Sequence, residues 1–228
     1  MKRVDKIATA ILLNYKRPQN IKKIVDALRS QTVPVKIFLW NNNPEYSFKN
    51  IVDLEILSSE NLRCFPRWTL SSFSETKYIF SLDDDMLPID NDVIKKCCAI
   101  YQKLPVKLDP IIGVSGVVLN ENLNYQQSTH LTIGHGQNVQ VDIVKGQFMF
   151  MRREIFKSIA LSDEFIFEDD IYINSYSKLK YLPSLISNSF ERLPNGEESL
   201  WRSPGHFQRR NEAIKKYKKL EFLFELKK

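Results

Sequence analysis

The chain is poor in glycine, and its few glycines come late. Seven of the 228 residues are glycine, and the first of them is Gly113. The first half therefore contains neither the GxGxxG turn of dinucleotide-binding folds nor the GxxxxGK[ST] phosphate loop. A nucleotide bound by this half would have to be held by side chains rather than by a glycine-rich backbone turn.

Cysteines and long apolar runs are also scarce. The three cysteines, Cys64, Cys97 and Cys98, form no CxxC pair, which argues against a structural zinc site or a disulfide framework. No run of about 18 apolar residues occurs, so the sequence predicts no transmembrane helix. We therefore expect a cytoplasmic protein, with at most peripheral contact with the cytoplasmic face of a membrane.

The positive charge is concentrated near the C-terminus. The net charge is +6, and much of the excess lies in RRNEAIKKYKKLEFLFELKK, residues 209–228. The rest of the chain is only mildly basic, so we expect no nucleic-acid partner. In the C-terminal segment, Ile214, Tyr217 and Leu220 share one side and lysines the other, which predicts a basic amphipathic helix. This helix could pack on the domain or lie on an anionic membrane that carries a lipid-linked acceptor.

Strand-like and helix-like segments alternate along the first half. Strand character is found in residues 6–15, 35–43, 53–59 and 77–85. Residues 18–31 have helical apolar spacing and begin with a proline, and a second helix is expected from Asp90 to about Leu104. This alternation predicts an α/β fold with a mostly parallel central sheet flanked by helices.

The second half shows shorter and more varied segments. Predicted strands are 111–119, 141–153 and 181–187, and predicted helices are 153–160 and 169–179. A polar insertion, 120–140, is expected to be a loop or hairpin, and its His130 and His135 receive no role. We expect one domain over 1–228, with a nucleotide-binding half (1–105) and an acceptor-binding half (106–228).

Polar side chains follow the predicted strands of the first half. Ligands of open α/β sheets bind beyond the carboxyl ends of the strands, so these side chains should converge. They are Asn14, Tyr15 and Arg17, then Asn41, Asn42 and Asn43, then Asn61, Arg63 and Arg67, and finally Asp83, Asp84 and Asp85. The amides could read the edge of a base, although Asn41 to Asn43 could equally form an ordinary turn.

The triplet Asp83-Asp84-Asp85 needs a compensating positive charge. Arginines can bind a diphosphate, but the three carboxylates would repel it unless a divalent cation lay between them. Hard oxygen ligands favour Mn²⁺ or Mg²⁺ over zinc. The sequence therefore predicts a metal–diphosphate complex here. The alternative is that the aspartates cap the following helix or form a solvated turn.

Two further polar groups lie in the second half. Glu168, Asp169 and Asp170 could stabilise the start of a helix or face a reacting carbon or an acceptor hydroxyl. His206 and Arg210 stand one helical turn apart and could meet a phosphate or a metal. The alternative for this pair is a surface histidine on a basic helix face.

Seven segments occur in an order that resembles the GT-A glycosyltransferases, and more closely the exostosin-like glycosyltransferases of family 64. These segments are ILLNYKRP, IFLWNN, NLRCFPR, YIFSLDDDML, GQFMF, FEDDIYIN and LWRSPGHFQRR, the last with the spacing of Trp201, His206 and Arg210. The resemblance implies a Rossmann-like GT-A fold. It also implies metal-dependent transfer of a sugar, most often from a UDP-linked donor, to a hydroxyl of a glycan or lipid-linked acceptor, with retention of anomeric configuration.

The resemblance also implies roles for individual residues. Arg17 would contact the diphosphate, Asp83 the ribose, and Asp85 the metal. Asn42, Asn61 and Arg67 would hold the base or the phosphates. Asn14, Tyr15 and Asp84 are further candidates for nucleotide binding, from their positions at the strand ends. Asp170 would act at the anomeric centre with Asp169 beside it, and Arg210 would lie near the phosphates. Asp83 and His206 are further candidates for metal ligands.

Three alternatives stay open at this point. An inverting transferase would use Asp169 or Asp170 as a general base. A sugar-nucleotide nucleotidyltransferase would normally need a glycine-rich first loop, and LLNYKRPQN has no glycine. The third alternative is a sugar-nucleotide-binding or nucleic-acid-binding module without catalysis.

Overall fold

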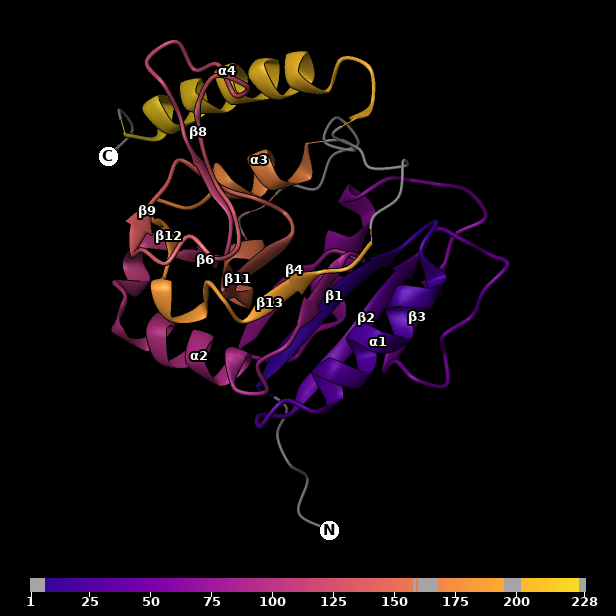
Figure 1. Ribbon diagram of the computed structural model, residues 1–228. Coiled ribbons are helices and arrows are strands. Elements are labelled where there is room, and N and C mark those ends of the chain that lie inside the picture. The colour runs from indigo at the N-terminus through magenta and orange to yellow at the C-terminus, as the bar shows by residue number, and fades with distance from the viewer. Residues whose placement is uncertain (1–6, 158, 160–167, 195–201, 226–228) are drawn as a thin grey trace.

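The computed structural model describes residues 7–157, 159, 168–194 and 202–225, with side chains as far as Tyr217. Within these residues, eight strands form a central sheet in the order β3-β2-β1-β4-β11-β6-β12-β9 (Figure 1). Their bounds are β1 Ala8–Asn14, β2 Val35–Asn41, β3 Leu54–Leu57, β4 Tyr78–Leu82, β6 Ile111–Gly113, β9 Val139–Gln140, β11 Phe148–Arg152 and β12 Lys180–Leu182. Two smaller sheets join β10 (Ile143–Val144), β7 (Gly116–Val118) and β8 (Thr129–Leu131), and β13 (Phe190–Arg192) with β5 (Met86–Pro88).

The first half supplies four parallel strands of the sheet, as the sequence predicted, and a further parallel pair, β6 with β12, lies in the second half. β1 pairs in parallel with both β2 and β4, and β2 pairs in parallel with β3. The second half adds β11 antiparallel to β4, with Phe148 opposite Leu82. The two halves of the chain therefore share one sheet.

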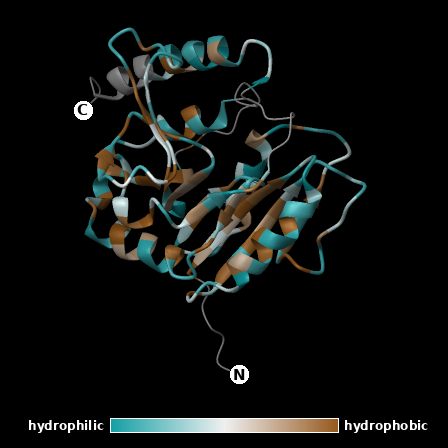
Figure 2. Ribbon diagram, viewed as in Figure 1, coloured by the Kyte–Doolittle hydropathy of each residue, from teal (hydrophilic) through white to brown (hydrophobic). Residues whose placement is uncertain are grey.

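Helices cover both faces of this sheet. The α-helices are α1 Pro18–Arg29, α2 Val93–Lys103, α3 Asp169–Asn174 and α4 His206–Glu225, and the 3-10 helices are η1 Phe65–Phe73, η2 Val106–Leu108, η3 Arg153–Lys157 and η5 Ser184–Ile186. In α1, Pro18 sets the first turn and the apolar residues recur at helical spacing, so Ile21, Ile24, Val25 and Leu28 are all buried. The opposite side of α1 is hydrophilic (Figure 2).

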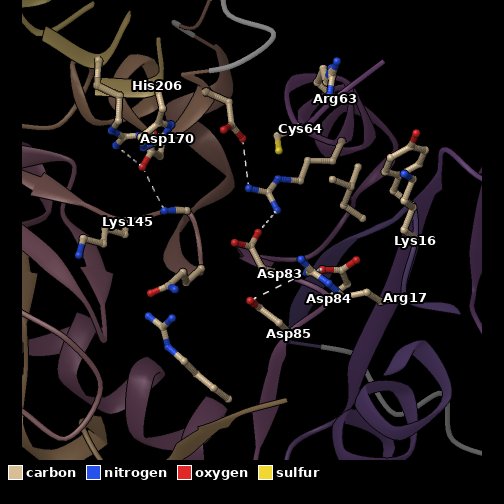
Figure 3. Close-up of a pocket in the computed structure, with 18 of the residues that line it drawn as sticks. Lys16, Arg17, Arg63, Cys64, Asp83, Asp84, Asp85, Lys145, Asp170 and His206 are labelled. Atoms are coloured by element: carbon tan, nitrogen blue, oxygen red, sulfur yellow. Dashed lines mark hydrogen bonds and ion pairs between the residues drawn. The ribbon is translucent and has the colours of Figure 1, made fainter. Parts of the chain in front are cut away.

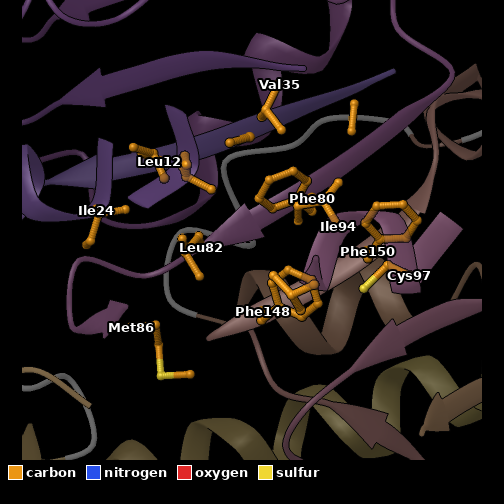
Figure 4. Close-up of a cluster of buried hydrophobic side chains, with 14 of the residues drawn as sticks. Leu12, Ile24, Val35, Phe80, Leu82, Met86, Ile94, Cys97, Phe148 and Phe150 are labelled. Carbon is orange, nitrogen blue, oxygen red and sulfur yellow. The ribbon is translucent and has the colours of Figure 1, made fainter. Parts of the chain in front are cut away.

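The alternation of side chains along β1 divides the core in two. Ala10 and Leu12 point to one face and belong to the cluster that includes Ile24 of α1, Ile94 of α2 and the phenylalanines of β4 and β11 (Figure 4). Ile11 points to the other face and belongs to a cluster completed by η1, α3 and α4. The central sheet is thus covered by apolar side chains on both of its faces.

The C-terminal helix packs on the domain through the part whose side chains are described. Ile214 and Tyr217 of α4 are buried, and the ring of Tyr217 lies 5.3 Å from that of Tyr172 in α3. None of the described helices combines the length and apolarity needed to cross a bilayer. Contact of this helix with a membrane surface stays a prediction.

Several segments of the second half differ from the sequence prediction. The expected strand 111–119 is broken between Gly113 and Gly116, and the expected strand 141–153 is broken between β10 and β11. The expected strand 181–187 ends at Leu182, because Pro183 has no N–H to donate, and continues as η5. Part of the polar insertion forms a hairpin, as expected: β8 pairs antiparallel with β7, the strand just before the insertion.

The two helices predicted between residues 153 and 179 are shorter than expected. The helix predicted over 153–160 is the 3-10 helix η3, ending at Lys157; Ser158 and Ala160 lie outside the described residues. The helix predicted over 169–179 ends at Asn174, whose side-chain amide bonds both the N–H and the C=O of Val144 at 2.9 and 2.8 Å. Asn174 thereby ties the end of α3 to the strand β10.

Candidate active site

A cavity of about 590 Å³ opens at the carboxyl ends of β1 and β4 (Figure 3). The chain runs from β1 outward to β2 on one side, while β4 lies on the other side of β1, so the strand order reverses here. The cavity brings together many of the residues that the sequence singled out. These are Tyr15, Arg17, Asn61, Arg63, Arg67, Asp83, Asp84, Asp85, Asp169, Asp170, His206 and Arg210.

Arg17 is held by the aspartate triplet. It directly precedes α1, and its guanidinium donates to the carboxylate of Asp84 and lies 3.9 Å from an oxygen of Asp85. The side-chain amide of Asn20 donates to the backbone carbonyl of Asp84 at 2.9 Å. Burial raises the pKa of Asp84 to about 7, although the charge of Arg17 opposes that rise. Asp84 therefore positions Arg17 at the mouth of the cavity.

Arg67 connects the two acidic groups of the chain. It comes from η1, is only 1% exposed, and donates to Asp83 at 2.6 Å and to Asp169 at 3.1 Å. The indole N–H of Trp68 also donates to Asp169, at 2.7 Å. Arg67 and Asp83 were expected to contact the nucleotide; both line the cavity, and they are bonded to each other.

Arg210 forms the third charged cluster, around α3 and the start of α4. Its guanidinium donates to both carboxylate oxygens of Asp170, at 3.0 and 2.8 Å, and to Glu168 at 3.0 Å. The ring of Tyr125 covers the guanidinium, with 4.2 Å between the guanidinium carbon and the ring centroid. Arg210 is 6% exposed, so its interactions act where water screens little.

Three neighbouring carboxyls at the start of α3, those of Glu168, Asp169 and Asp170, differ in how readily they bind a proton. Burial alone would raise the pKa of Asp170, but Arg210 and the N–H groups of Ile171 and Gly146 together hold it below its usual range. Burial raises the pKa of Asp169, and raises that of Glu168 to about 7, against the charges of their arginine partners. Among these three carboxyls, Asp170 is therefore the one whose ionised form is most favoured.

His206 lines the cavity as a neutral ring. Burial and the charge of Arg210 lower its pKa to about 4. Its ring lies 5.2 Å from that of Phe207 and 6.5 Å from that of Tyr125, centroid to centroid. Trp201, the first residue of the spacing seen in the sequence, lies outside the described residues.

The carboxylates fit a cation that is shared with a ligand. In the part of the chain that the structure describes, no three His, Cys, Asp or Glu side chains form a metal cage. Asp85 is 8% exposed and lines the cavity next to Asp83 and Asp84. Mg²⁺ is commonly bound by one or two carboxylates together with phosphate oxygens, and the aspartate triplet matches that donor set.

Two of the expected nucleotide contacts lie outside the cavity lining. The amide of Asn14 is buried and donates to Asn41 at 2.7 Å. Asn42 accepts from the indole of Trp40 and donates to the carbonyl of Arg63, both at 3.0 Å. These amides hold the strand ends together, because a buried amide without partners would be costly.

Arg63 is a strained residue in the cavity wall. Its φ is 64°, a left-handed conformation that non-glycine residues rarely adopt. Asn61 accepts from the Arg63 N–H at 3.0 Å, while Asn42 donates to its carbonyl. The two amides that the sequence assigned to the nucleotide thus fix the loop that presents Arg63.

Other cavity residues were not found from the sequence. They are Leu13, Lys16, Cys64, Tyr125, Gln126, His130, Lys145, Gly146, Gln147, Arg192 and Phe207. His130, which received no role, lines the cavity and bonds the carbonyl of Tyr125 at 2.7 Å through Nε2. Tyr125, Gln126 and His130 lie in the polar insertion, and Lys145, Gly146, Gln147 and Arg192 lie in short strands or beside them, where no periodic pattern marks a ligand contact. Leu13, Lys16, Cys64 and Phe207 are neighbours in the chain of residues that the sequence did single out.

The arrangement of the sheet and cavity is that of a GT-A glycosyltransferase. The chain is similar to the crystal structure of S. aureus TarS 1-349 in complex with UDP-GlcNAc, with a TM-score of 0.64 and 11% identity, over 92% of this chain and 66% of that chain. For the crystal structure of S. aureus TarS 1-349, the TM-score is 0.53 at 13% identity, over 78% of this chain and 58% of that chain. At these identities the similarity shows the fold, and it confirms the predicted fold class.

The family follows from the sequence itself. The family model described as "Glycosyl transferase family 64 domain" matches residues 8–226. The chain therefore belongs to glycosyltransferase family 64, which confirms the resemblance and makes it a glycosyltransferase by family and fold. No curated protein matches the chain.

Proposed function

We propose that this chain transfers a sugar from a UDP-linked donor to an acceptor hydroxyl of a glycan, assisted by a divalent cation. The observation that carries the proposal is the cavity of a family 64 domain, in which Arg17 and Arg67 bond the aspartate triplet and Arg210 bonds Asp170. The UDP-GlcNAc of the TarS complex, a protein of similar fold, supports a UDP-linked donor.

The charges of the cavity suit a leaving diphosphate. When bound, a divalent cation would offset the negative charge that develops on the diphosphate. Asp85 would hold it, with Asp83 as a second candidate. Arg17 is held in place by its hydrogen bond to Asp84. It would add a positive charge on the side of the cavity where the cation binds, and this charge would not need to move during the reaction.

The state of Asp170 favours retention of configuration. A general base should have a pKa near neutrality, whereas the pKa of Asp170 is held low by Arg210. A permanently ionised carboxylate is better suited to stabilising the positive charge that forms on the sugar. The acceptor would then attack from the side of the leaving group, and its proton would pass to the diphosphate.

Asp169 keeps the inverting reaction as a second candidate. Its pKa is raised by burial, as a general base requires, but its Oδ2 already accepts from both Arg67 and Trp68. NMR of the anomeric linkage in the product distinguishes the two reactions. An inverted product would exclude the role given to Asp170.

Calorimetry with UDP tests the function itself. We expect UDP to bind at least tenfold more tightly with Mn²⁺ than without it, because the carboxylates repel the diphosphate in the absence of a cation. UMP is the matched control, since it lacks the second phosphate and should show a smaller metal effect. Absent or metal-independent UDP binding would contradict the proposal. A screen of nucleotide sugars for Mn²⁺-dependent hydrolysis would then identify the donor.

A further inference from the structure

Two cations of the cavity have no place in the site described so far. Lys145 and Arg192 both line the cavity. Lys145 lies on the side of Asp170 and His206, across from Lys16, Arg17 and Arg63 (Figure 3). The cavity therefore has positive charge on two sides, with the aspartate triplet between them.

Neither cation is neutralised by the protein. Across the described parts of the chain, no hydrogen bond or ion pair joins the ammonium group of Lys145 or the guanidinium of Arg192 to another residue. The nearest acidic partner for Lys145, Asp170, already accepts two bonds from Arg210 and one from the N–H of Gly146 at 3.3 Å. Its carboxylate oxygens are thus already occupied.

The surroundings of Lys145 are unfavourable for a lone cation. Lys145 is half-buried, and burial together with the charges of Arg210 and Arg192 lowers its pKa to about 8. Like charges gathered in a cavity destabilise one another unless an anion enters. This side of the cavity is therefore poised to bind negative charge.

Regular structure fixes both residues in place. Lys145 directly follows β10, its N–H donates to the carbonyl of Ser115 at 2.9 Å, and the next residue, Gly146, bonds Asp170. Arg192 ends β13, opposite Met86 of β5. The two backbones are thus fixed before a ligand binds, whereas the exposed side chain of Arg192 would become ordered on binding.

We propose that Lys145 and Arg192 form an anion subsite for a carboxylate or phosphate group carried by the acceptor or by the transferred sugar. The subsite is separate from the contacts to the donor diphosphate and rests on the proposed glycosyl transfer. Its Lys145 lies on the side of Asp170, where the two sugars would meet. The substrate class it selects is an acidic glycan or an acidic donor sugar.

An NMR titration of the protein saturated with UDP and Mg²⁺ tests this subsite, because UDP fills the diphosphate contacts. The probes are galacturonate and glucose 6-phosphate, with galactose and glucose as neutral counterparts. We expect the anionic probes to bind at least tenfold more tightly than the neutral ones. Lys145→Met and Arg192→Gln should each reduce that preference at least tenfold. Lys23→Met, which removes an exposed charge on α1, is the matched control and should retain it.

The outcomes separate the subsite from the proposed function. If UDP fails to bind, the proposed function is wrong, and the same probes titrated into the free protein still decide the subsite. Equal binding of charged and neutral probes would overturn the subsite. The subsite would also be overturned if Lys145→Met and Arg192→Gln lost as much affinity for UDP as for the anionic probes. Lys145 and Arg192 would then bind the diphosphate of the donor.

The source of the anion follows from a second comparison. If the wild-type protein prefers UDP-galacturonic acid to UDP-galactose, and Lys145→Met removes this preference, the anion belongs to the transferred sugar. If the two donors bind equally while the free anionic probes bind alongside them, the anion belongs to the acceptor. Either result supports the subsite and assigns its ligand.

Discussion

Replacing Arg67 with methionine should test how strongly the two acidic groups depend on one buried cation. The change removes the guanidinium and keeps much of the apolar stem. Arg67 is 1% exposed and makes charge-assisted bonds of 2.6 Å to Asp83 and 3.1 Å to Asp169. Removing one partner of a buried ion pair typically costs about 3–5 kcal/mol, because the other charge is left without compensation.

The cost should come mainly from Asp169. Asp169 is 5% exposed and cannot be rehydrated, whereas the side chain of Asp83 is 32% exposed and can bind water instead. We therefore expect Arg67→Met to lower the free energy of unfolding by about 3–5 kcal/mol. Asp83→Asn should lower it by about 1 kcal/mol or less. The double variant Arg67→Met/Asp169→Asn should recover at least half of the loss, since no buried charge remains.

Urea unfolding followed by circular dichroism measures these differences. In Arg67→Met, Asp169 loses the cation that opposes its burial, so its folded pKa rises further above the unfolded value of about 3.9. The folded protein then binds a proton more readily than the unfolded chain, and stability falls as the pH rises. The loss should thus be smaller near about pH 5 than near about pH 8. A cost below about 1 kcal/mol, or equal costs for Arg67→Met and Asp83→Asn, would refute this account of the pair.

Three further substitutions test separate parts of the molecule. Asp85→Asn should weaken Mn²⁺-dependent UDP binding at least tenfold with an unchanged circular dichroism spectrum, and equal binding would exclude Asp85 as the metal ligand. The pKa of His206 is about 4 in the folded protein and about 6.5 in the unfolded chain. Between these two pH values the unfolded chain binds more protons than the folded protein, so the free energy of unfolding rises with pH. In His206→Gln the free energy of unfolding should depend less on pH between these values. Identical slopes against pH in the variant and the wild type would contradict the lowered pKa of His206. Gly116→Ala would place a Cβ 2.7 Å from the carbonyl oxygen of Ile143. We therefore expect it to lower the free energy of unfolding in urea by about 1–3 kcal/mol. An unchanged unfolding midpoint would show that β7 and β10 can move apart without cost.

Helices and strands whose apolar residues recur at regular spacing could be predicted from the sequence. Those that form only through contacts with residues far away in the chain could not. α1 begins at Pro18, and β1 and β4 lie within their predicted ranges, because local pattern and burial agree there. By contrast, β13 exists only because it pairs with β5, about 100 residues earlier in the chain. The break in the predicted strand 111–119 likewise depends on packing, since a Cβ on Gly113 would meet Val144 at 2.2 Å.

For the site, the sequence predicted about half of the residues that line the cavity, but not which of them bond one another. The ends of parallel strands meet at one edge, so the meeting of Arg17 with the aspartate triplet followed from topology. The bond between Arg67 and Asp169 joins residues about 100 positions apart and depends on how η1 and α3 pack. Lys145 and Arg192 stood in short segments without periodicity, so nothing in the sequence marked them as neighbours.

The position of β4 at the centre of the sheet has a consequence for synthesis on the ribosome. One neighbour, β1, is made before β4, but the other, β11, ends about 70 residues after Leu82. At roughly 5–20 residues per second, one edge of the segment YIFSL stays unpaired for about 4–14 s, and such an edge can template aggregation. Lys77 and the aspartate triplet flank this segment with charge, an arrangement that suppresses aggregation of exposed apolar strands. The same three carboxylates that face the cavity in the folded enzyme would thus protect the nascent chain before the cavity exists.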